Sequence, residues 1–259
     1  MTLALFSFNF WRDRLRASTI HLGISLSIAA LAALLVFGIW YPYPYREISG
    51  GRELFFIVVS VDVILGPLIT LAVFNRKKPW TELRLDLTVV GLIQLSALVY
   101  GIWTVAVARP VHLVFEIDRF RVVHAIDVDP ALLKDTPQGI VALPWTGPTL
   151  LAVRPFKDSK ESFDATMAAI QGASLGARPD LWQPYAAGIP NVLLAAKPVS
   201  NLRVRFPKQV AQIDQVLQKL GKTPGSVVYL PLAGRKDFWT VLLDATTAEV
   251  LGTLPLDSF

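Results

Sequence analysis

Three long runs of apolar residues, all in the first 110 positions, constrain this chain more than any other feature of its sequence. The runs cover residues 20–40, 54–74 and 87–108. The first and third contain no charged residue, and the second contains one, Asp62. A run of roughly 18 or more apolar residues is long enough to cross a bilayer as a helix. The sequence therefore predicts three transmembrane helices in a membrane domain of residues 1–109, followed by a soluble domain of residues 110–259.

The composition agrees with this division. Only 17% of the 259 residues are charged, whereas typical soluble domains have about 25%. Residues 1–109 contain 10 Lys and Arg and 6 Asp and Glu, a net charge of +4, and residues 110–259 contain 15 and 14, a net charge of +1. A face that binds nucleic acid needs clustered Lys and Arg. The soluble domain has no such excess, so we expect no nucleic-acid partner.

The positive charges also predict how the spans are oriented, because Lys and Arg are concentrated in the cytoplasmic loops of membrane proteins. Here they stand before the first span and between the second and third, at Arg12, Arg14, Arg16, Arg76, Lys77, Lys78 and Arg84. In the loop between the first two spans, Glu47 and Glu53 offset Arg46 and Arg52. The first run is too long for a cleaved signal peptide, so we interpret it as a retained anchor. We expect a cytoplasmic N-terminus and, after three crossings, a soluble domain in the periplasm of a bacterium.

Asp62 is the residue that most strongly suggests a function. An ionisable group inside a span costs at least ~2.5 kcal/mol on insertion scales and usually faces a protein interior. At about 1.5 Å per residue, Asp62 and Tyr100 lie at nearly the same depth, and Gln94 lies about half a turn lower. Three interpretations are open: a hydrogen bond with Tyr100 or Gln94 that joins two spans, a contact with a polar group on a partner's membrane helix, or a step in a proton or ion path.

Gly66 and Pro67 follow Asp62 within the same span. Pro67 cannot donate a backbone hydrogen bond to Val63, four residues earlier, so we expect a kink there. Gly66 allows a neighbouring backbone to come close. Together with Asp62, the pair predicts a locally open concavity lined by polar groups. The candidate partner-binding residues of this region are Asp62, Gly66, Pro67, Gln94 and Tyr100.

An aromatic segment, Tyr41-Pro-Tyr-Pro-Tyr45, follows the first span directly. One interpretation is an aromatic belt at the level of the lipid headgroups, with two prolines that end the helix. The other is a stiff recognition surface for a partner helix. The second interpretation makes Tyr41, Tyr43 and Tyr45 candidate partner-binding residues as well.

The soluble part contains patterns of both strands and helices. Strands are predicted at residues 111–117, 120–127, 150–153, 192–196, 226–230, 238–243 and 250–254. The first two form a hairpin around Asp118 and Arg119. Helices are predicted at residues 160–171 and 207–220, and the second begins with Pro207 and ends at Gly221. The fold class is thus a membrane protein with three transmembrane helices and a soluble α+β domain, whose sheet is mostly antiparallel.

Signals of catalysis are mostly absent. Residues 172–176 read Gly-Ala-Ser-Leu-Gly, but a nucleophile elbow needs a preceding strand and a later His, and the last His of the chain is His124. We interpret this segment as the glycine-containing end of a helix. In a two-residue hairpin His112 and His124 would face opposite sides of the sheet, which disfavours a shared metal site. We expect no enzyme activity, no metal and no cofactor.

A series of short motifs occurs in a fixed order along the chain. They are Tyr41-Pro-Tyr-Pro-Tyr45, Ser49-Gly-Gly51, Val61-Asp-Val-Ile-Leu-Gly-Pro67, Asp86-Leu87, Gln94-Leu95, Tyr100-Gly101, Arg109-Pro-Val111 and Phe115-Glu-Ile-Asp-Arg-Phe120, followed later by Arg178-Pro-Asp180, Trp182 and Pro184-Tyr185. In this order they resemble the type IV pilin accessory proteins of the TfpX/TfpZ type. The resemblance implies an inner-membrane protein that acts with a particular major pilin, and with other pilus assembly components, in pilin handling, pilus assembly or dynamics. It supplies no catalytic residues.

The sequence thus favours a non-enzymatic assembly factor. Its second and third spans would cradle the membrane helix of the pilin near Asp62 and Pro67, while its soluble domain would contact the pilin head. An alternative is a membrane-anchored periplasmic sensor or small transporter that uses Asp62, although the short inner loop provides no cytoplasmic signalling domain. A tethered hydrolase is a third possibility, and the absence of a His after Ser174 argues against it.

Overall fold

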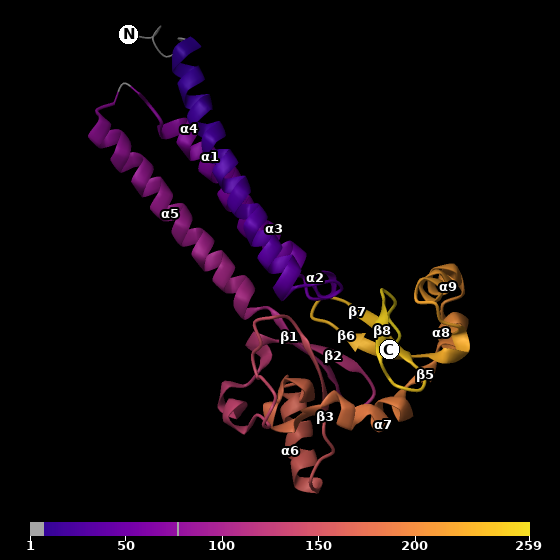
Figure 1. Ribbon diagram of the computed structural model, residues 1–259. Helices are drawn as coiled ribbons and strands as arrows, with labels where there is room; N and C mark the ends of the chain where they lie inside the picture. Colours follow the sequence, from indigo (N-terminus) through magenta and orange to yellow (C-terminus); the bar gives the residue numbers. More distant parts are fainter. Residues whose placement is uncertain (1–7, 77) are drawn as a thin grey trace. The chain divides into compact units, whose positions relative to one another are not determined.

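The computed structural model describes residues 8–76 and 78–259, and the chain divides into two compact units. The first unit holds the chain up to Ile39 together with Arg52–Val107, and the second holds Trp40–Gly51 together with Ala108–Phe259 (Figure 1). The loop between the first two spans therefore belongs to the second unit. The sequence did not predict this assignment.

The first unit consists of long helices. Its elements are α1 (Phe8–Leu35), the π-helical turn η2 (Val36–Trp40), α3 (Gly51–Ser60), a second π-helical turn η3 (Val61–Leu65), α4 (Gly66–Val73) and α5 (Trp80–Val107). Three stretches are long and apolar enough to cross a membrane, namely Trp11–Trp40, Gly51–Val73 and Trp80–Val107. The three predicted spans are thus confirmed as helices.

Many apolar side chains of these helices point outward. Leu31, Leu34 and Ile93 have 68%, 70% and 63% of their surface exposed. In water, exposed apolar surface costs roughly 25 cal/mol per Å², whereas lipid tails are as apolar as these side chains. The outer surface of this unit therefore suits a bilayer, as expected of a membrane protein.

Inside the first unit, glycines allow the helices to pack closely. A methyl group placed on Gly66 of α4 would overlap the side chain of Gln94 on α5. A methyl group on Gly101 of α5 would overlap the side chain of Val58 on α3. The predicted close approach at Gly66 is confirmed, but a neighbouring side chain, rather than a neighbouring backbone, fills the space.

The second unit, every residue of which the structure describes, is built on one eight-stranded sheet. The strands are β1 (Pro110–Phe115), β2 (Phe120–His124), β3 (Thr149–Val153), β4 (Trp182–Pro184), β5 (Lys197–Pro198), β6 (Val227–Ala233), β7 (Phe238–Asp244) and β8 (Val250–Leu254). Their order is β4-β3-β1-β2-β6-β7-β8, with β5 paired to β6. The β1·β3 and β2·β6 pairs are parallel and the others are antiparallel. The predicted α+β domain with a mostly antiparallel sheet is confirmed.

Helices and short helical turns accompany these strands in the second unit. They are α2 (Tyr45–Ile48), η4 (Ala125–Asp127), η5 (Pro130–Asp135), α6 (Ser159–Ile170), η6 (Leu175–Ala177), η7 (Pro179–Leu181), α7 (Tyr185–Ala195), α8 (Val199–Arg205), η8 (Pro207–Gln209), α9 (Val210–Lys219) and η9 (Pro224–Ser226). Helix α2 comes from the loop between the first two spans, and the others follow β2. The helix predicted at residues 160–171 is α6, and the one predicted at 207–220 corresponds to η8 and α9. Gly221 follows α9 with φ of 63°, a left-handed conformation that glycine adopts without steric cost.

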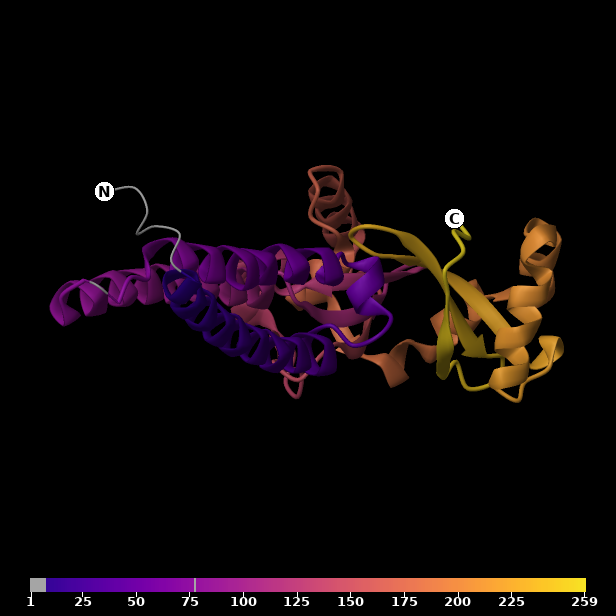
Figure 2. The ribbon, with the colours of Figure 1, turned by 90° about the horizontal axis from the view of Figure 1, so that it is seen from above.

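Apolar side chains form three buried clusters in the second unit. The first joins strands β1, β2, β6 and β7 to α7, and Ile48 of α2 is part of it. The second surrounds Trp182, where β1 and β3 meet the turns η6 and η7. The third places Leu202 of α8 and Ile213 of α9 against β6, β7 and β8, and Figure 2 shows these orange helices beside the yellow strands.

The strand predicted at residues 192–196 is wrong, because this stretch is the end of helix α7 and the residue after it. Val192 is fully buried. Gly188, one turn earlier, lies so close to Ala152 of β3 that a methyl group there would overlap it. The helix therefore packs on the sheet through small residues. A short apolar run does not by itself distinguish a buried strand from a buried helix.

The hairpin at the start of the sheet also differs from its predicted form. Phe115 pairs with Phe120, so the loop has four residues instead of two. The second strand ends at His124 instead of residue 127. Its end is set by Asp127, whose carboxylate accepts a hydrogen bond from the backbone N–H of His124 at 3.2 Å and so turns the chain into η4.

Candidate functional site

The first candidate site is a groove in the membrane unit that contains Asp62. Asp62 lies in the π-helical turn η3, immediately before Gly66 and Pro67. Pro67 has no N–H for the carbonyl of Val63, and a wider π-helical turn, with bonds to the fifth residue, accommodates that loss. The predicted kink thus takes the form of a π-helical turn. Such turns inside α-helices are frequent at functional sites.

The groove has a volume of about 390 Å³ and lies between the second span and α5. Its lining is largely apolar and consists of Leu54, Ile57, Val58, Val61, Asp62, Leu65, Ile69, Ile93, Gln94, Ala97, Leu98, Tyr100, Gly101 and Thr104. The structure therefore brings Asp62, Gln94 and Tyr100 to one groove, as their depth predicted, but the predicted lining of polar groups is wrong, because most of the lining is apolar. Gly66 and Pro67 are buried behind it, in α4. We refer to this region as the Asp62 groove.

The half-buried carboxylate of Asp62 makes no hydrogen bond or ion pair within the part of the chain that the structure describes. Tyr100 is 68% exposed and its ring lies 6.0 Å from that of Trp103. The first of the three interpretations of Asp62, a hydrogen bond that joins the spans, is therefore not found among these residues. Because placing a carboxylate inside a membrane span costs free energy, we expect Asp62 to have a polar or charged partner.

A different set of polar side chains joins the spans. The Nδ1 atom of His21 on α1 lies 2.6 Å from the Oγ1 atom of Thr70 on α4. The hydroxyl of Ser18 donates a hydrogen bond to the carbonyl of Pro67 at 2.9 Å. Gln94 packs over Gly66 beside these groups, but its buried amide nitrogen has no hydrogen-bond partner among the described residues. We call Ser18, His21, Gly66 and Thr70 the polar crossing.

Sequence reasoning did not single out Ser18, His21 or Thr70. The signal was present, because Ser18 and His21 are three residues apart and so share one face of α1. Ser25, one turn further, is also buried. A one-sided row of polar residues in a span is typical of contacts between membrane helices.

The aromatic segment after the first span belongs to the soluble unit. Tyr41 is 1% exposed, and Tyr45 packs against the first apolar cluster. Burial raises the pKa of Tyr41 above its ordinary value, and it raises the pKa of Tyr45 to about 12. Tyr43 is different, because it is 58% exposed and its ring lies 6.1 Å from that of Trp239. A partner that contacts this segment would thus meet Tyr43, while Tyr41 and Tyr45 hold the fold.

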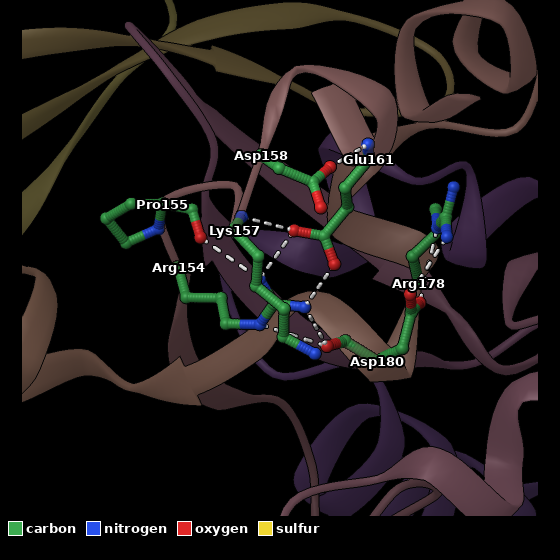
Figure 3. Close-up of polar contacts among 7 residues, drawn as sticks. All are labelled: Arg154, Pro155, Lys157, Asp158, Glu161, Arg178 and Asp180. Atoms are coloured by element: carbon green, nitrogen blue, oxygen red, sulfur yellow. Dashed lines mark hydrogen bonds and ion pairs between the residues drawn. The ribbon is translucent and has the colours of Figure 1, made fainter. Parts of the chain in front are cut away.

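The second candidate site is the helix α6, which a group of polar contacts fixes at its first turn (Figure 3). Arg154 donates two hydrogen bonds to the carboxylate of Glu161, at 2.9 and 2.7 Å. Asp158 accepts a hydrogen bond from the backbone N–H of Glu161 at 2.7 Å and caps the helix. Arg154 also donates to the carbonyl of Asp180 at 3.1 Å. Because Arg154 stabilises its charged form, Glu161 has a pKa lowered to about 2.

Beyond this first turn, α6 has an apolar face that is not covered. Ala165 is the buried residue of the helix, whereas Phe163, Met167 and Ile170 are 64%, 39% and 74% exposed. These three residues follow a spacing of four and three and so share one face. We call them the α6 surface. Sequence reasoning identified the helix as amphipathic, but it could not show that this apolar stripe faces outward.

The motifs that suggested chemistry have structural roles. Gly172 has φ of 99° and follows the end of α6, as predicted for the glycine-containing segment. Gly176 donates its backbone N–H to the buried carboxylate of Glu116 at 2.9 Å, and its carbonyl accepts from the indole of Trp182 at 2.8 Å. These contacts hold the loop around Ser174 in place.

The two histidines of the domain lie on opposite faces of the sheet, as predicted. His112 pairs with Val123, so His124 projects to the other side. His112 lies 2.7 Å from Thr149 Oγ1 and 2.9 Å from the carbonyl of Ala142, and burial lowers its pKa to about 4. No group of three metal-ligating side chains occurs in residues 8–76 and 78–259.

The chain has three candidate membrane spans joined to an α+β domain. The spans contain a carboxylate that has no partner among the described residues, and the domain has an exposed apolar helix face. These features define a membrane-anchored protein with surfaces suited to partners. The family described as "Fimbrial assembly protein FimB" matches residues 9–50. This match covers the whole first span, Trp11–Trp40, and the segment through Tyr41, Tyr43 and Tyr45 that belongs to the soluble unit.

The whole chain is similar to fimbrial assembly proteins of Dichelobacter nodosus. The protein of serogroup I is 35% identical over 249 residues, which cover 94% of this chain and 95% of that protein. The protein of serogroup E1 is 34% identical with the same coverage, and that of serogroups C1 and C2 is 42% identical over 123 residues, or 48% of this chain and 92% of that protein. The chain therefore belongs to the FimB family of fimbrial assembly proteins and takes part in pilus biogenesis. No solved structure matches it.

Proposed function

We propose that this protein is an inner-membrane accessory factor of type IV pili that binds the major pilin through both its membrane helices and its soluble domain. Its N-terminus would be cytoplasmic and its soluble domain periplasmic, as the distribution of Lys and Arg indicates. Membership in the FimB family supports the setting, and the motifs that resemble the TfpX/TfpZ proteins support the pilin as partner. The Asp62 groove is the observation that carries the binding proposal.

The chemistry of the groove favours a membrane helix as its occupant. Apolar side chains line most of it, and they would pack against an apolar helix from a partner. Asp62 then needs a hydrogen-bond donor or a cation from that helix, because no group in the described residues bonds to it. An interhelical hydrogen bond in a membrane contributes about 1–2 kcal/mol in model peptides. Asp62 would therefore select a helix that carries a donor at this depth.

The α6 surface supplies a second contact, to the globular head of the pilin. Phe163, Met167 and Ile170 offer apolar area on a helix whose first turn is fixed by Arg154 and Glu161. Two weak contacts made by one chain with one partner raise the overall affinity, because the second contact forms at a high effective concentration. This arrangement suits a factor that must hold a pilin and then release it.

Photo-crosslinking tests the proposal. A photoreactive residue at Ala97, which lines the Asp62 groove, should trap pilin, whereas one at Val99, an exposed position of α5 outside the groove, should not. Asp62→Asn should lower the yield from Ala97 by about tenfold, the equivalent of 1.4 kcal/mol. Equal trapping from Ala97 and Val99 would remove the groove from the account. No trapping of pilin, combined with an ion flux that depends on Asp62, would favour the transporter alternative.

A reporter that is active only in the periplasm, fused after Phe259, tests the orientation. We expect this reporter to be active, because the proposed topology places the soluble domain in the periplasm. A reporter that is active only in the cytoplasm, and works at the same position, would contradict the proposed topology and the contact with a periplasmic pilin head.

A further inference from the structure

A second groove lies in the membrane unit, on the side of the predicted inner surface. It has a volume of about 670 Å³, and the residues that line it come from α1, the end of the second span, and α5. They are Asp13, Arg16, Ala17, Ile20, His21, Ile24, Thr70, Phe74, Arg76, Leu87, Val90, Gly91 and Gln94. We call it the inner groove. It is distinct from the Asp62 groove, although Gln94 lines both.

One end of the inner groove is charged. Arg16 and Arg76 stand there with one carboxylate, Asp13, which lies 3.4 Å from Arg76. The side chain of Arg76 is 72% exposed, so it is only partly engaged by Asp13. The wider surroundings are basic. The segments on the predicted inner side, before the first span and between the second and third, contain seven Lys and Arg but only three acidic residues, Asp13, Glu82 and Asp86. An anion at this end would be favoured.

The other end of the inner groove is apolar. Ile20 and Ile24 of α1 are 57% and 55% exposed, and they face Val90 and Gly91 of α5 across the groove. His21 is eight residues from Asp13, or about 12 Å along the helix. Its hydrogen bond with Thr70 lies at the deep end of the groove. The groove thus changes from charged to apolar along the direction in which a lipid molecule changes from headgroup to acyl chain.

We propose that the inner groove binds an anionic phospholipid of the cytoplasmic leaflet. The phosphate lies between Arg16 and Arg76, and one acyl chain lies along Ile20, Ile24 and Val90. Basic pockets between membrane helices on the cytoplasmic side bind such headgroups. The lipid fills the space between α1 and α5. This inference is independent of pilin binding, which was assigned to the Asp62 groove and the α6 surface, and only the choice of leaflet rests on the proposed orientation of the spans.

The inner groove has a charged end and an apolar end, and this combination distinguishes a lipid from other occupants. Inorganic phosphate would satisfy Arg16 and Arg76, but it would leave the apolar half of the groove uncovered. An apolar helix from another protein would cover that half and leave Arg16 and Arg76 with a single carboxylate, that of Asp13, among the described residues that line the groove. A phospholipid with a net negative charge matches both ends.

Lipid retention during purification provides the test. The full-length protein would be purified in mild detergent with equal amounts of dioleoyl phosphatidylglycerol and dioleoyl phosphatidylcholine, and the retained lipids counted by native mass spectrometry. We expect retention of phosphatidylglycerol. The double variant Arg16→Gln/Arg76→Gln should reduce it by about thirtyfold, because each basic residue near anionic lipid contributes about 1 kcal/mol. The matched control is Arg12→Gln/Arg84→Gln, which removes two charges at the same level outside the groove and should retain the lipid.

A second pair of variants tests the apolar half. A Cβ atom at Gly91 or at Gly23 would meet no atom within 4 Å, so the first side-chain atom of a leucine fits at either position. Gly91→Leu places a side chain in the groove and should lower lipid retention severalfold, whereas Gly23→Leu, outside the groove, should not. Equal retention by groove and control variants would overturn the proposal. Equal thermal stabilisation by inorganic phosphate and by phosphatidylglycerol would also overturn it, because that result indicates an anion site without a lipid.

Discussion

The membrane unit contains polar side chains in two places, and it satisfies them differently. In the polar crossing, His21 contacts Thr70 at 2.6 Å and Ser18 donates to the carbonyl of Pro67. In the Asp62 groove, the most costly polar group of the spans has no bonding partner within the described residues. The comparison distinguishes two roles that polar side chains can have inside a membrane. Groups that pair within the chain hold its helices together, and a group that does not pair is available to another molecule.

The soluble domain shows the same contrast. Glu116 is buried and bonds to Arg121 and to the backbone of Gly176. The α6 surface, by comparison, leaves Phe163 and Ile170 exposed, while the first turn of its helix is firmly anchored. An exposed apolar patch on the surface of a soluble domain is typical of a surface that binds a partner. The predictions below test two expectations. Side chains with partners inside the protein should matter for its stability, and the Asp62 groove and the α6 surface should matter for binding.

The largest effect should come from the polar crossing. Gly66→Leu forces a side chain into the space of Gln94 and should destabilise the membrane unit by about 3 kcal/mol, the upper end of the usual range for overpacking, because three helices meet there. Thermal unfolding in detergent measures the effect. Gly23→Leu is the matched control, since the added side chain meets no neighbour within 4 Å. Similar melting temperatures for the two variants would show that the crossing does not hold the helices.

The second effect concerns pH and the soluble domain. His112 is buried, and its folded-state pKa is lowered to about 4 from an ordinary value near 6.5. The unfolded chain therefore binds a proton more readily, so His112 favours folding fully above pH 6.5, and this stability is lost as the pH falls from 6.5 towards 4. The loss should be about 3 kcal/mol when complete. Urea unfolding at a series of pH values, followed by the fluorescence of the soluble domain, measures this loss of unfolding free energy.

His112→Gln should flatten this pH dependence, because glutamine does not titrate. His124 has a lowered pKa as well, so part of the dependence should remain. A slope unchanged by His112→Gln would show that the burial of His112 does not set the pH response.

A third, smaller effect tests the α6 surface. Ile170→Asp places a charge on the apolar face and should reduce pilin co-purification by about tenfold, or 1.4 kcal/mol, without a change in domain stability. Ala169→Asp puts the same charge on an exposed position of the same helix that does not share the face of the α6 surface, and it should leave co-purification unchanged. Equal losses from both variants would point to charge in general and not to this face.

The smallest effect should come from a single hydrogen bond of the polar crossing. His21→Ala removes the contact with Thr70 and should destabilise the membrane unit by about 0.6 kcal/mol, the mean for hydrogen bonds between membrane helices, and by at most about 1.7 kcal/mol. A small shift of the thermal unfolding midpoint in detergent is the expected result. A loss comparable to that of Gly66→Leu would indicate that polarity, and not packing, dominates the crossing.

Much of the fold could be predicted from the sequence, since long apolar runs and alternating patterns depend on local residues alone. The three spans, helix α6 and the end of α9 at Gly221 follow from such patterns. The helix α7 was missed because its apolar residues fit a buried strand equally well. The burial of Tyr41 and Ile48 in the soluble unit could not be predicted, since it depends on contacts with residues about 60 to 190 positions away, such as Arg109 and Gly234.

The candidate site was predicted in part. Depth along the helices brought Asp62, Gln94 and Tyr100 to one level, and the structure places them in one groove. That Asp62 forms no hydrogen bond with any residue the structure describes depends on side-chain geometry, which spacing does not reveal. The outward direction of Phe163, Met167 and Ile170 was equally hidden, because an apolar stripe has the same pattern whether it faces a core or a partner.

The central claim is that Asp62 serves a partner while the polar crossing serves the fold. It is tested most directly by measuring, for Asp62→Asn and His21→Ala in parallel, the thermal unfolding midpoint and the amount of pilin co-purified per folded molecule. We predict that Asp62→Asn loses pilin and keeps its unfolding midpoint, whereas His21→Ala lowers the midpoint and keeps pilin. An Asp62→Asn variant that is destabilised like His21→Ala and still retains pilin would contradict the claim.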